Sequence, residues 1–410
     1  DGPFDGLFGS YTNSDPLDGQ YMTGGWDGYR SKLVNAGIDF RADYTSETMG
    51  VASGGMSRGA RYSQQIRLNA DFDMAKIAGW SDGRFHLQLN DRRGNGTSTD
   101  LAGNRYPIQE NYGQQWTKIT EMSFDQNLFN GRVNYRIGYM PFGNTYAMNP
   151  MMGNFVNAAL AYHPLSYAGN TSWSNYPNPR WAGYVTAYVL PDLYIRAGVS
   201  QANSNLNLVS NSFDPFASGT TGAVVPVEIG YEPAKGTAYP GHYKVGFFYD
   251  SSNVKKQGST DTVGHRDGAY VMFDQKITTV GGNNNRGLSL FGHYMWSSPD
   301  TALLRNWASA GFIYTGLFAS RPKDVLAFGY VQSSVNKQLL ENARLKADAT
   351  PGSFDAFTTA ESLYEVSYNF QINNWASIRP DVQYITDPGS FYFKHTANVL
   401  AVGAQVKIAI

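Results

Sequence analysis

The chain has 410 residues, a formal net charge of −1 and no cysteine. The near-zero charge argues against a nucleic-acid partner, and the lack of cysteine excludes a disulfide framework and a thiolate metal site. No uninterrupted apolar run reaches the roughly 18 residues of a transmembrane helix. A membrane β-barrel stays open, because its strands are only half apolar.

The composition favours a β protein. The 44 glycines, 28 tyrosines and 23 phenylalanines suit a chain rich in turns and aromatic strands. No linker, charge run or shift in composition divides the sequence, so we expect a single domain over residues 1–410. The chain starts at Asp1 without a charged and apolar leader, as expected for a processed exported protein.

In chain order, alternation of polar and apolar residues predicts about 16 strands, an even number of the kind that bacterial barrels use. The first eight predicted ranges are 38–51, 61–77, 83–92, 116–129, 131–141, 180–190, 193–203 and 223–233. The other eight are 238–252, 267–280, 286–298, 306–320, 324–335, 357–372, 375–386 and 397–410.

The connections between these strands alternate in length. The short connections, rich in turn-forming residues, include 130–131, 191–192, 233–236, 281–285, 321–324 and 373–374. The long connections include 93–115, 141–179, 204–222, 253–266 and 336–356. Short turns at one rim and long loops at the other describe an all-β, antiparallel barrel of the outer membrane, with periplasmic turns and extracellular loops. We expect a periplasmic segment over 1–37 and the barrel over 38–410.

Alternation also predicts which side chains face the lumen. In "RVNYRIGYM", residues 132–140, Arg132 and Arg136 share one face and Tyr135 and Ile137 share the other. An arginine on lipid near the midplane would cost about 2–4 kcal/mol, so Arg132 and Arg136 are predicted to be lumen wall residues. The clearest strands carry nearly equal numbers of inward basic and acidic residues, which favours a neutral, hydroxyl-rich solute or an unselective water channel.

Several segments resemble the OprB-type carbohydrate-selective porins of Gram-negative outer membranes. They are "GGWDGYRSKLVNAGIDF" (24–40), "RIGYMPFGNTYA" (136–147), "NFVNAAL" (154–160), "SWSNYPNPRWAGYV" (172–185), "RGLSLFG" (286–292), "ASRPKD" (319–324) and "IRPDVQYITDPGS" (378–390). Their order and spacing together carry the resemblance. It implies a 16-stranded barrel that passes glucose and related sugars down their gradient, with loops folded into the lumen.

Two features depart from the family. Members often carry a cysteine pair in the third loop, whereas "GNFVNAALAY" (153–162) has none, so this loop is expected to be fixed differently. The chain ends in Ile410 rather than in the usual aromatic residue, which bears on how the barrel-assembly signal is read.

The resemblance also points to candidate sugar-binding residues. Arg92 and Glu110 match the positions expected at the constriction, Arg93 and Arg84 would extend a basic path, and Trp173 is the aromatic candidate. A sugar site needs charged or amide groups for the hydroxyls and a flat aromatic for the apolar face of the ring. The alternative is that all five are ordinary loop or wall residues with no role in sugar binding.

Three function classes stay open on the sequence. They are a sugar-selective channel, a general diffusion porin for small hydrophilic solutes, and a barrel that acts as an enzyme or adhesin. The pattern Gly-x-Ser-x-Gly in "GMSRG" (55–59) lies in a Gly-rich hairpin and not at a strand-to-helix turn, so no catalytic site is predicted. No metal or cofactor is predicted; the expected partners are sugars, outer-membrane lipid and lipopolysaccharide, and the barrel-assembly machinery.

Overall fold

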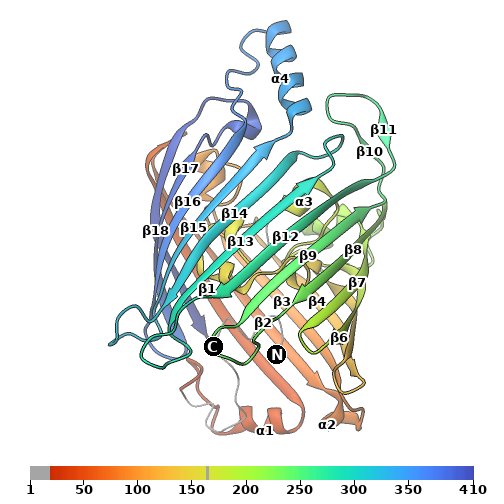
Figure 1. Cartoon of the computed structure of the whole chain (residues 1–410), viewed down its shortest axis with the longest axis vertical. Helices are drawn as coiled ribbons and strands as arrows, with labels where there is room; N and C mark the ends of the chain where they lie inside the picture. The colour runs from red at the N-terminus through yellow and green to blue at the C-terminus, as the bar shows by residue number, and fades with distance from the viewer. Residues whose placement is uncertain (1–18, 163–165) are drawn as a thin grey trace.

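The protein folds into a closed antiparallel β-barrel of 16 strands (Figure 1). The computed structural model describes residues 19–162 and 166–410. The first eight strands are β1 (Ile38–Gly55), β2 (Gly59–Asp73), β3 (Gly83–Gly94), β4 (Trp116–Leu128), β5 (Val133–Met140), β6 (Arg180–Leu190), β7 (Leu193–Ala202) and β8 (Gly222–Tyr231). The rest are β9 (Gly241–Asp250), β12 (Arg266–Lys276), β13 (Gly287–Ser297), β14 (Leu304–Thr315), β15 (Val325–Val335), β16 (Ala360–Gln371), β17 (Ala376–Thr386) and β18 (Ala397–Ala409). Each strand pairs with its neighbours in sequence, and β1 closes the barrel on β18.

The strands follow the alternation of the sequence. On β16, Glu361 and Glu365 are buried, whereas Tyr364 and Val366 on the opposite face are 42% and 45% exposed. On β18, Gln405 and Lys407 point inward and Val402 points outward. The apolar outer face meets lipid and the polar inner face meets the lumen, which confirms the predicted fold class and the predicted facing of these strands.

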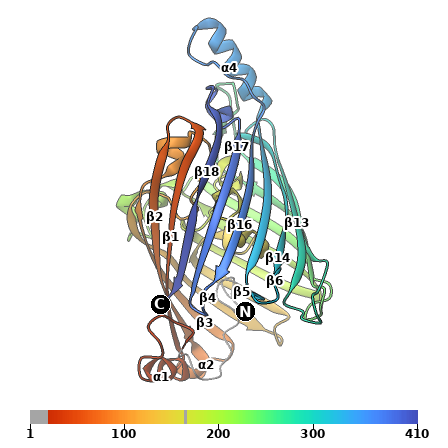
Figure 2. The same cartoon turned by 90° about the vertical axis from the view of Figure 1, so that its left-hand side faces the viewer.

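The two ends of the barrel differ as predicted. The C-terminus, α1 (Tyr29–Asn35) and α2 (Met74–Ala78) lie at the end with the short turns, and the long loops with α4 (Lys337–Ala349) lie at the other (Figures 1 and 2). Two joins at the long-loop end are short, over residues 56–58 and 298–303. No helix of the described residues has the length and apolarity that a membrane crossing requires.

Several segments differ from the predicted strands and loops, and three of them show the physical reason. The range 61–77 is not all strand, because Asp73 ends β2 and caps α2 by accepting a hydrogen bond from the Ala75 N–H at 3.0 Å. The connection 253–266 contains a small hairpin of β10 (Val254–Lys255) and β11 (Thr262–Val263). The connection 336–356 contains α4, whose N-cap is Asn336.

The N-terminal segment braces the last strand at the turn end. Residues 1–18 of the predicted segment 1–37 lie outside the described residues. Met22 donates its N–H to the Ala409 carbonyl at 2.8 Å. The Arg30 guanidinium donates to the Ile410 carbonyl at 3.1 Å and stacks on the Trp26 ring at 4.2 Å.

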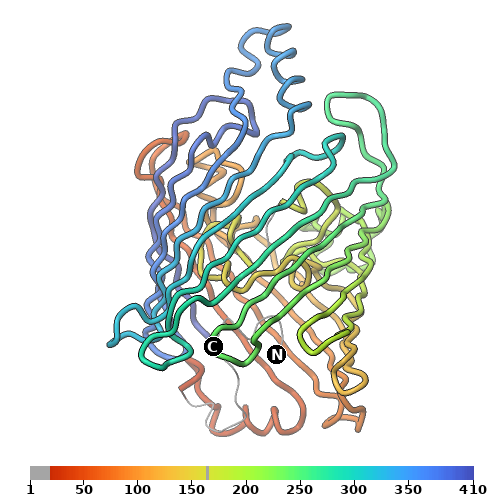
Figure 3. Tube along the Cα trace, in the orientation of Figure 1, coloured from red at the N-terminus to blue at the C-terminus, as the bar shows by residue number. Residues whose placement is uncertain are grey.

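Loop 3, residues 141–179 between β5 and β6, folds into the barrel (Figure 3). It contains the short helices η2 (Phe142–Asn144), η3 (Pro150–Asn154), η4 (Ala158–Leu160) and α3 (Ser166–Asn170). The remaining short helices are η1 (Ser98–Ala102), η5 (Ser204–Asn207), η6 (Val209–Asn211) and η7 (Ser390–Tyr392). The main hydrophobic core lies inside the barrel, where Phe155 and Tyr167 of loop 3 pack on β12 to β15 through residues such as Phe291 and Trp307. Loop 3 therefore fills one side of the lumen and leaves the other side open.

Candidate solute site

Carboxylates of the barrel wall hold the backbone of loop 3. Three of them, on β8, β9 and β16, each accept a hydrogen bond from a loop 3 N–H. The bonds are Ala147 to Glu228 Oε2 at 2.9 Å, Ser172 to Asp250 Oδ2 at 2.6 Å and Val156 to Glu365 Oε1 at 2.5 Å. Charge-assisted bonds of this kind are about twice as strong as neutral ones.

Wall cations hold the same loop through its carbonyl groups. The bonds are Arg196 Nη1 to Thr145 O at 2.9 Å, Lys244 Nζ to Met148 O at 2.7 Å and Arg379 Nη1 to Gly153 O at 3.2 Å. Loop 3 is thus fixed at six points by wall charges of both signs, which supplies the restraint that the missing cysteines would have given. Many of the inward basic and acidic residues anchor loop 3. Their nearly equal numbers are therefore weak support for a neutral solute.

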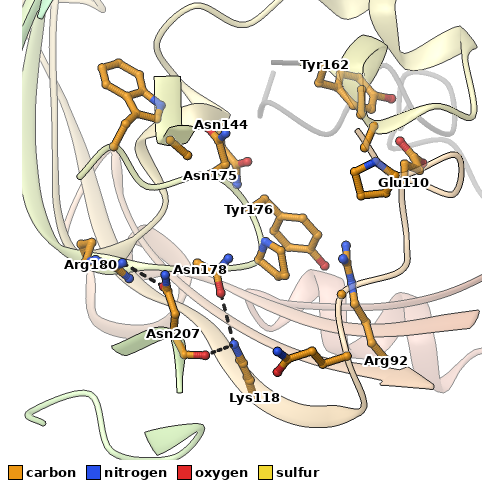
Figure 4. A pocket seen from close by; sticks show the side chains of 18 of the residues that line it. Arg92, Glu110, Lys118, Asn144, Tyr162, Asn175, Tyr176, Asn178, Arg180 and Asn207 are labelled. Atoms are coloured by element: carbon orange, nitrogen blue, oxygen red, sulfur yellow. Dashed lines mark hydrogen bonds between the residues drawn. The ribbon is translucent and has the colours of Figure 1, made fainter. Parts of the chain in front are cut away.

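A cavity of about 740 Å³ lies between loop 3, the other inward loops and the facing barrel wall. Its walls are loop 2 (residues 95–115), loop 3, loop 4 (residues 203–221), residues 252–254 and the inner faces of β1, β2, β3, β4, β6, β12 and β18. Figure 4 shows the side chains that line it. Three of the five predicted sugar-binding residues, Arg92, Glu110 and Trp173, line this cavity.

Arg92, on β3, is held in place by its neighbours. Its Nε donates to Gln65 Oε1 at 3.0 Å, and its guanidinium lies 5.7 Å from the ring centres of both Trp116 and Tyr176. Within the described part of the chain, no group accepts a hydrogen bond from its terminal nitrogens. Those donors remain available to a solute.

Glu110 in loop 2 lies above Arg92 in Figure 4. Its N–H donates to the Val156 carbonyl of loop 3 at 2.9 Å. Its carboxylate oxygen lies 3.8 Å from Lys407 Nζ and accepts from Gln405 at 3.4 Å. The cavity therefore presents the donors of Arg92 and the acceptors of Glu110 together.

Trp173 lines the cavity but belongs mainly to the core. It is 3% exposed, and its ring centre lies 5.3 Å from that of Tyr167 and 6.1 Å from that of Phe248. Its Nε1 is buried without a hydrogen-bond partner among the described residues. Trp116 and Tyr176, which the sequence analysis did not select, are the aromatic residues beside Arg92.

Two other predicted residues lie away from the cavity. Arg93 follows Arg92 on β3, so its side chain points to the outer face, where it pairs with Asp91 at 2.6 Å. This placement removes Arg93 from the candidate residues. Arg84 lies on the inner face near the turn end of β3, opposite Asp125 in the register, and does not reach the cavity.

Only one of the two predicted wall residues, Arg136, lies in the barrel wall. Arg136 is a buried wall residue on the inner face of β5 that pairs with Glu121 and donates from Nε to Ser123 Oγ at 2.9 Å. Arg132 is not in the wall, because β5 begins at Val133 and Arg132 lies exposed in the preceding turn.

The basic end of the cavity was not predicted. Lys118 on β4 donates from Nζ to Asn178 Oδ1 at 3.1 Å and to the Asn207 carbonyl at 3.3 Å. Arg180 on β6 donates from Nη2 to Asn207 Oδ1 at 2.8 Å. Lys118 follows loop 2 and Arg180 follows loop 3 in the sequence, and this position next to a long loop is a signal that could have identified them. Their contact with each other's neighbours, however, depends on loops 3 and 4 folding together.

A closed 16-stranded barrel, lined by polar residues and narrowed by an internal loop, defines a porin-type channel of the outer membrane. The sequence matches the carbohydrate-selective porin, OprB family, over residues 57–410. Porin B of Pseudomonas aeruginosa is 28% identical over 95% of this chain and 91% of its own length. The high-pH structure of Pseudomonas putida OprB has a TM-score of 0.90 to this chain at 29% identity, covering 97% of this chain and 100% of that one. The low-pH structure of the same protein has a TM-score of 0.64 at 25% identity, with the same coverage. The chain belongs to the OprB family of carbohydrate-selective porins and is an outer-membrane channel.

Proposed function

We propose that glucose and related mono- and oligosaccharides diffuse through the 740 Å³ cavity, and that Arg92 and Glu110 select them. The observation that carries this proposal is that both residues line the one side of the lumen that loop 3 leaves open. A sugar that enters the narrow part loses water from its hydroxyl groups. The guanidinium donates and the carboxylate accepts hydrogen bonds that replace part of this hydration.

Such a site must bind weakly, because a channel works only when its solute also leaves. No group of the cavity has to form or break a covalent bond for this function, and we propose that the barrel acts without catalysis. We also propose that the whole chain is one functional unit that contacts outer-membrane lipid and lipopolysaccharide through its apolar outer face and is inserted by the barrel-assembly machinery.

Liposome swelling tests the proposal against a general diffusion porin. Purified protein in liposomes is challenged with glucose and with neutral amino acids of similar size. We expect glucose to enter faster than the amino acids, and we expect Arg92→Ala to reduce that preference. Equal rates for sugars and amino acids of equal size would instead assign the chain to general diffusion.

A further inference from the structure

The end of the cavity below Tyr176 is basic, because the carboxylates of Glu110 and Glu47 act on Arg92 whereas no described carboxylate acts on Lys118 or Arg180. Arg92, Lys118 and Arg180 line it, and none of the three forms an ion pair within 4 Å with any described Asp or Glu. The other cavity cations are different. Arg67 pairs with Asp43 at 2.8 Å, Arg266 with Asp250 at 2.5 Å, and Lys407 lies 3.8 Å from Glu110.

Shared neighbours place these three cations close together. Lys118 and Arg180 both donate to Asn207, one to its carbonyl and the other to its side chain (Figure 4). Arg92 and Lys118 both lie beside the Trp116 ring, at 5.7 and 4.4 Å from its centre. One tryptophan and one asparagine therefore link the three charges into a continuous basic strip.

The partners of the strip satisfy hydrogen bonds without neutralising charge. Lys118 and Arg180 bind amide and carbonyl oxygens of Asn178, Pro179 and Asn207, all of which are neutral. Arg180 is 3% exposed, and its Nε is buried with no hydrogen-bond partner among the described residues. Like charges held together in a narrow cavity repel one another, and an anion is the group that relieves this repulsion.

We propose that the strip of Arg92, Lys118 and Arg180 binds the carboxylate of an acidic carbohydrate, so that this channel favours sugar acids over neutral sugars. The inference rests on the proposed function, since it assumes that carbohydrates cross this cavity. Glu110 lies beside Arg92, at the end of the strip away from Arg180 (Figure 4), and its carboxylate can accept hydrogen bonds from hydroxyl groups. A solute with hydroxyls at one end and a carboxylate at the other matches both ends.

Three fixed cations in a narrow cavity also raise the local concentration of the anionic solute. The effect depends on ionic strength, because the screening length falls from about 30 Å at 0.01 M salt to about 3 Å at 1 M. A preference that comes from this strip must therefore be large in dilute salt and small in concentrated salt.

The test compares glucuronate with glucuronamide, its neutral amide of nearly the same size and shape. Uptake of each labelled solute into proteoliposomes is measured at low and high salt, with glucose, glucose 6-phosphate and a neutral amino acid of similar size in parallel. The variants are Lys118→Gln and Arg180→Gln. The matched control is Arg93→Gln, which removes a cation from the outer face at the same height of the barrel.

We expect the parent to take up glucuronate about tenfold faster than glucuronamide in low salt, and each lumen variant to lower that ratio several-fold. Arg93→Gln should keep it. A ratio of one in the parent, or a ratio that both lumen variants leave unchanged, overturns the inference. If glucose still enters the liposomes faster than the amino acid in that case, the proposed sugar channel stands, and only the proposed preference for acidic sugars is overturned. If glucose 6-phosphate replaces glucuronate as the preferred solute, the carboxylate assignment is overturned in favour of phosphate.

Discussion

Glu365 on β16 holds the middle of loop 3, because its carboxylate accepts the Val156 N–H at 2.5 Å and the Asn157 N–H at 3.2 Å. The Glu365→Ala variant leaves both buried amide groups without an acceptor. Each such group costs about 1–3 kcal/mol, so we expect a lower unfolding midpoint. Loop 3 should also move more freely, and single-channel recordings in planar bilayers should show higher and noisier conductance.

The control is Glu341→Ala on α4, a glutamate whose side chain is 62% exposed and which pairs only with Arg344 at 3.7 Å. It should match the parent in both measurements. A Glu365→Ala channel with parental conductance, noise and melting would show that loop 3 does not depend on this carboxylate.

Arg92→Ala removes donors that face the solute. We expect sugar block of the ion current to weaken by about 1–3 kcal/mol, the scale of a lost charge-assisted hydrogen bond, while ion conductance stays the same or rises because the gap is wider. Titration of the open-channel current with glucose measures the change. Arg93→Ala, one residue further along β3, serves as the control, and equal sugar block in both variants would exclude Arg92 from the filter.

Glu110→Ala acts on charge as well as on sugar binding. The substitution leaves Lys407 without its acidic neighbour at 3.8 Å, so the cavity becomes more positive. We expect the zero-current potential across a salt gradient to shift toward anion selectivity, and sugar block to weaken as for Arg92→Ala. If the potential instead stays at its parental value, the Glu110 charge lies outside the ion path.

Val245→Arg tests the outer face. Val245 lies in the middle of β9 and is 45% exposed to the lipid side. An arginine near the bilayer midplane costs about 2–4 kcal/mol, which should appear as a lower free energy of unfolding in urea titrations of the protein in liposomes. Leu345→Arg on α4, outside the barrel, is the matched change at a residue of 60% exposure. A similar loss of stability in both would contradict the membrane placement of β9.

Alternation predicted the barrel well because the two faces of each strand meet such different surroundings. The boundary of β2 was wrong because "MAKIA" continues the apolar pattern, although Asp73 before it and Gly79 after it are the usual caps of a short helix. Asn336 followed by good helix formers would have predicted α4 in the same way. The selection of Arg93 contradicted the alternation itself. Adjacent side chains of a strand point to opposite faces, so Arg92 and Arg93 cannot both face inward.

The candidate site was only half predictable. Arg92 and Glu110 match the positions that the family resemblance implies for the constriction, so both could be selected from the sequence. Lys118 and Arg180 are 62 positions apart in the numbering, and each looks like an ordinary residue at a strand end. Their shared contact with Asn207 exists only after loop 4 folds over the barrel, which is a long-range event that no local pattern encodes.

The six tethers of loop 3 and the charged residues of the cavity belong to different strands. Residues of β7, β8, β9, β16 and β17 hold the loop, whereas β3, β4, β6, β18 and loop 2 supply Arg92, Lys118, Arg180, Lys407 and Glu110. Lys118 and Arg180 also bind Asn178 and Pro179 at the end of loop 3, but evolution or an engineer can alter them while the six tethers stay in place. A library of variants confined to Lys118, Asn178, Arg180 and Asn207 would change which solutes bind in the cavity while the six tethers of loop 3 stay in place. This property suits the barrel to nanopore sensing of small molecules.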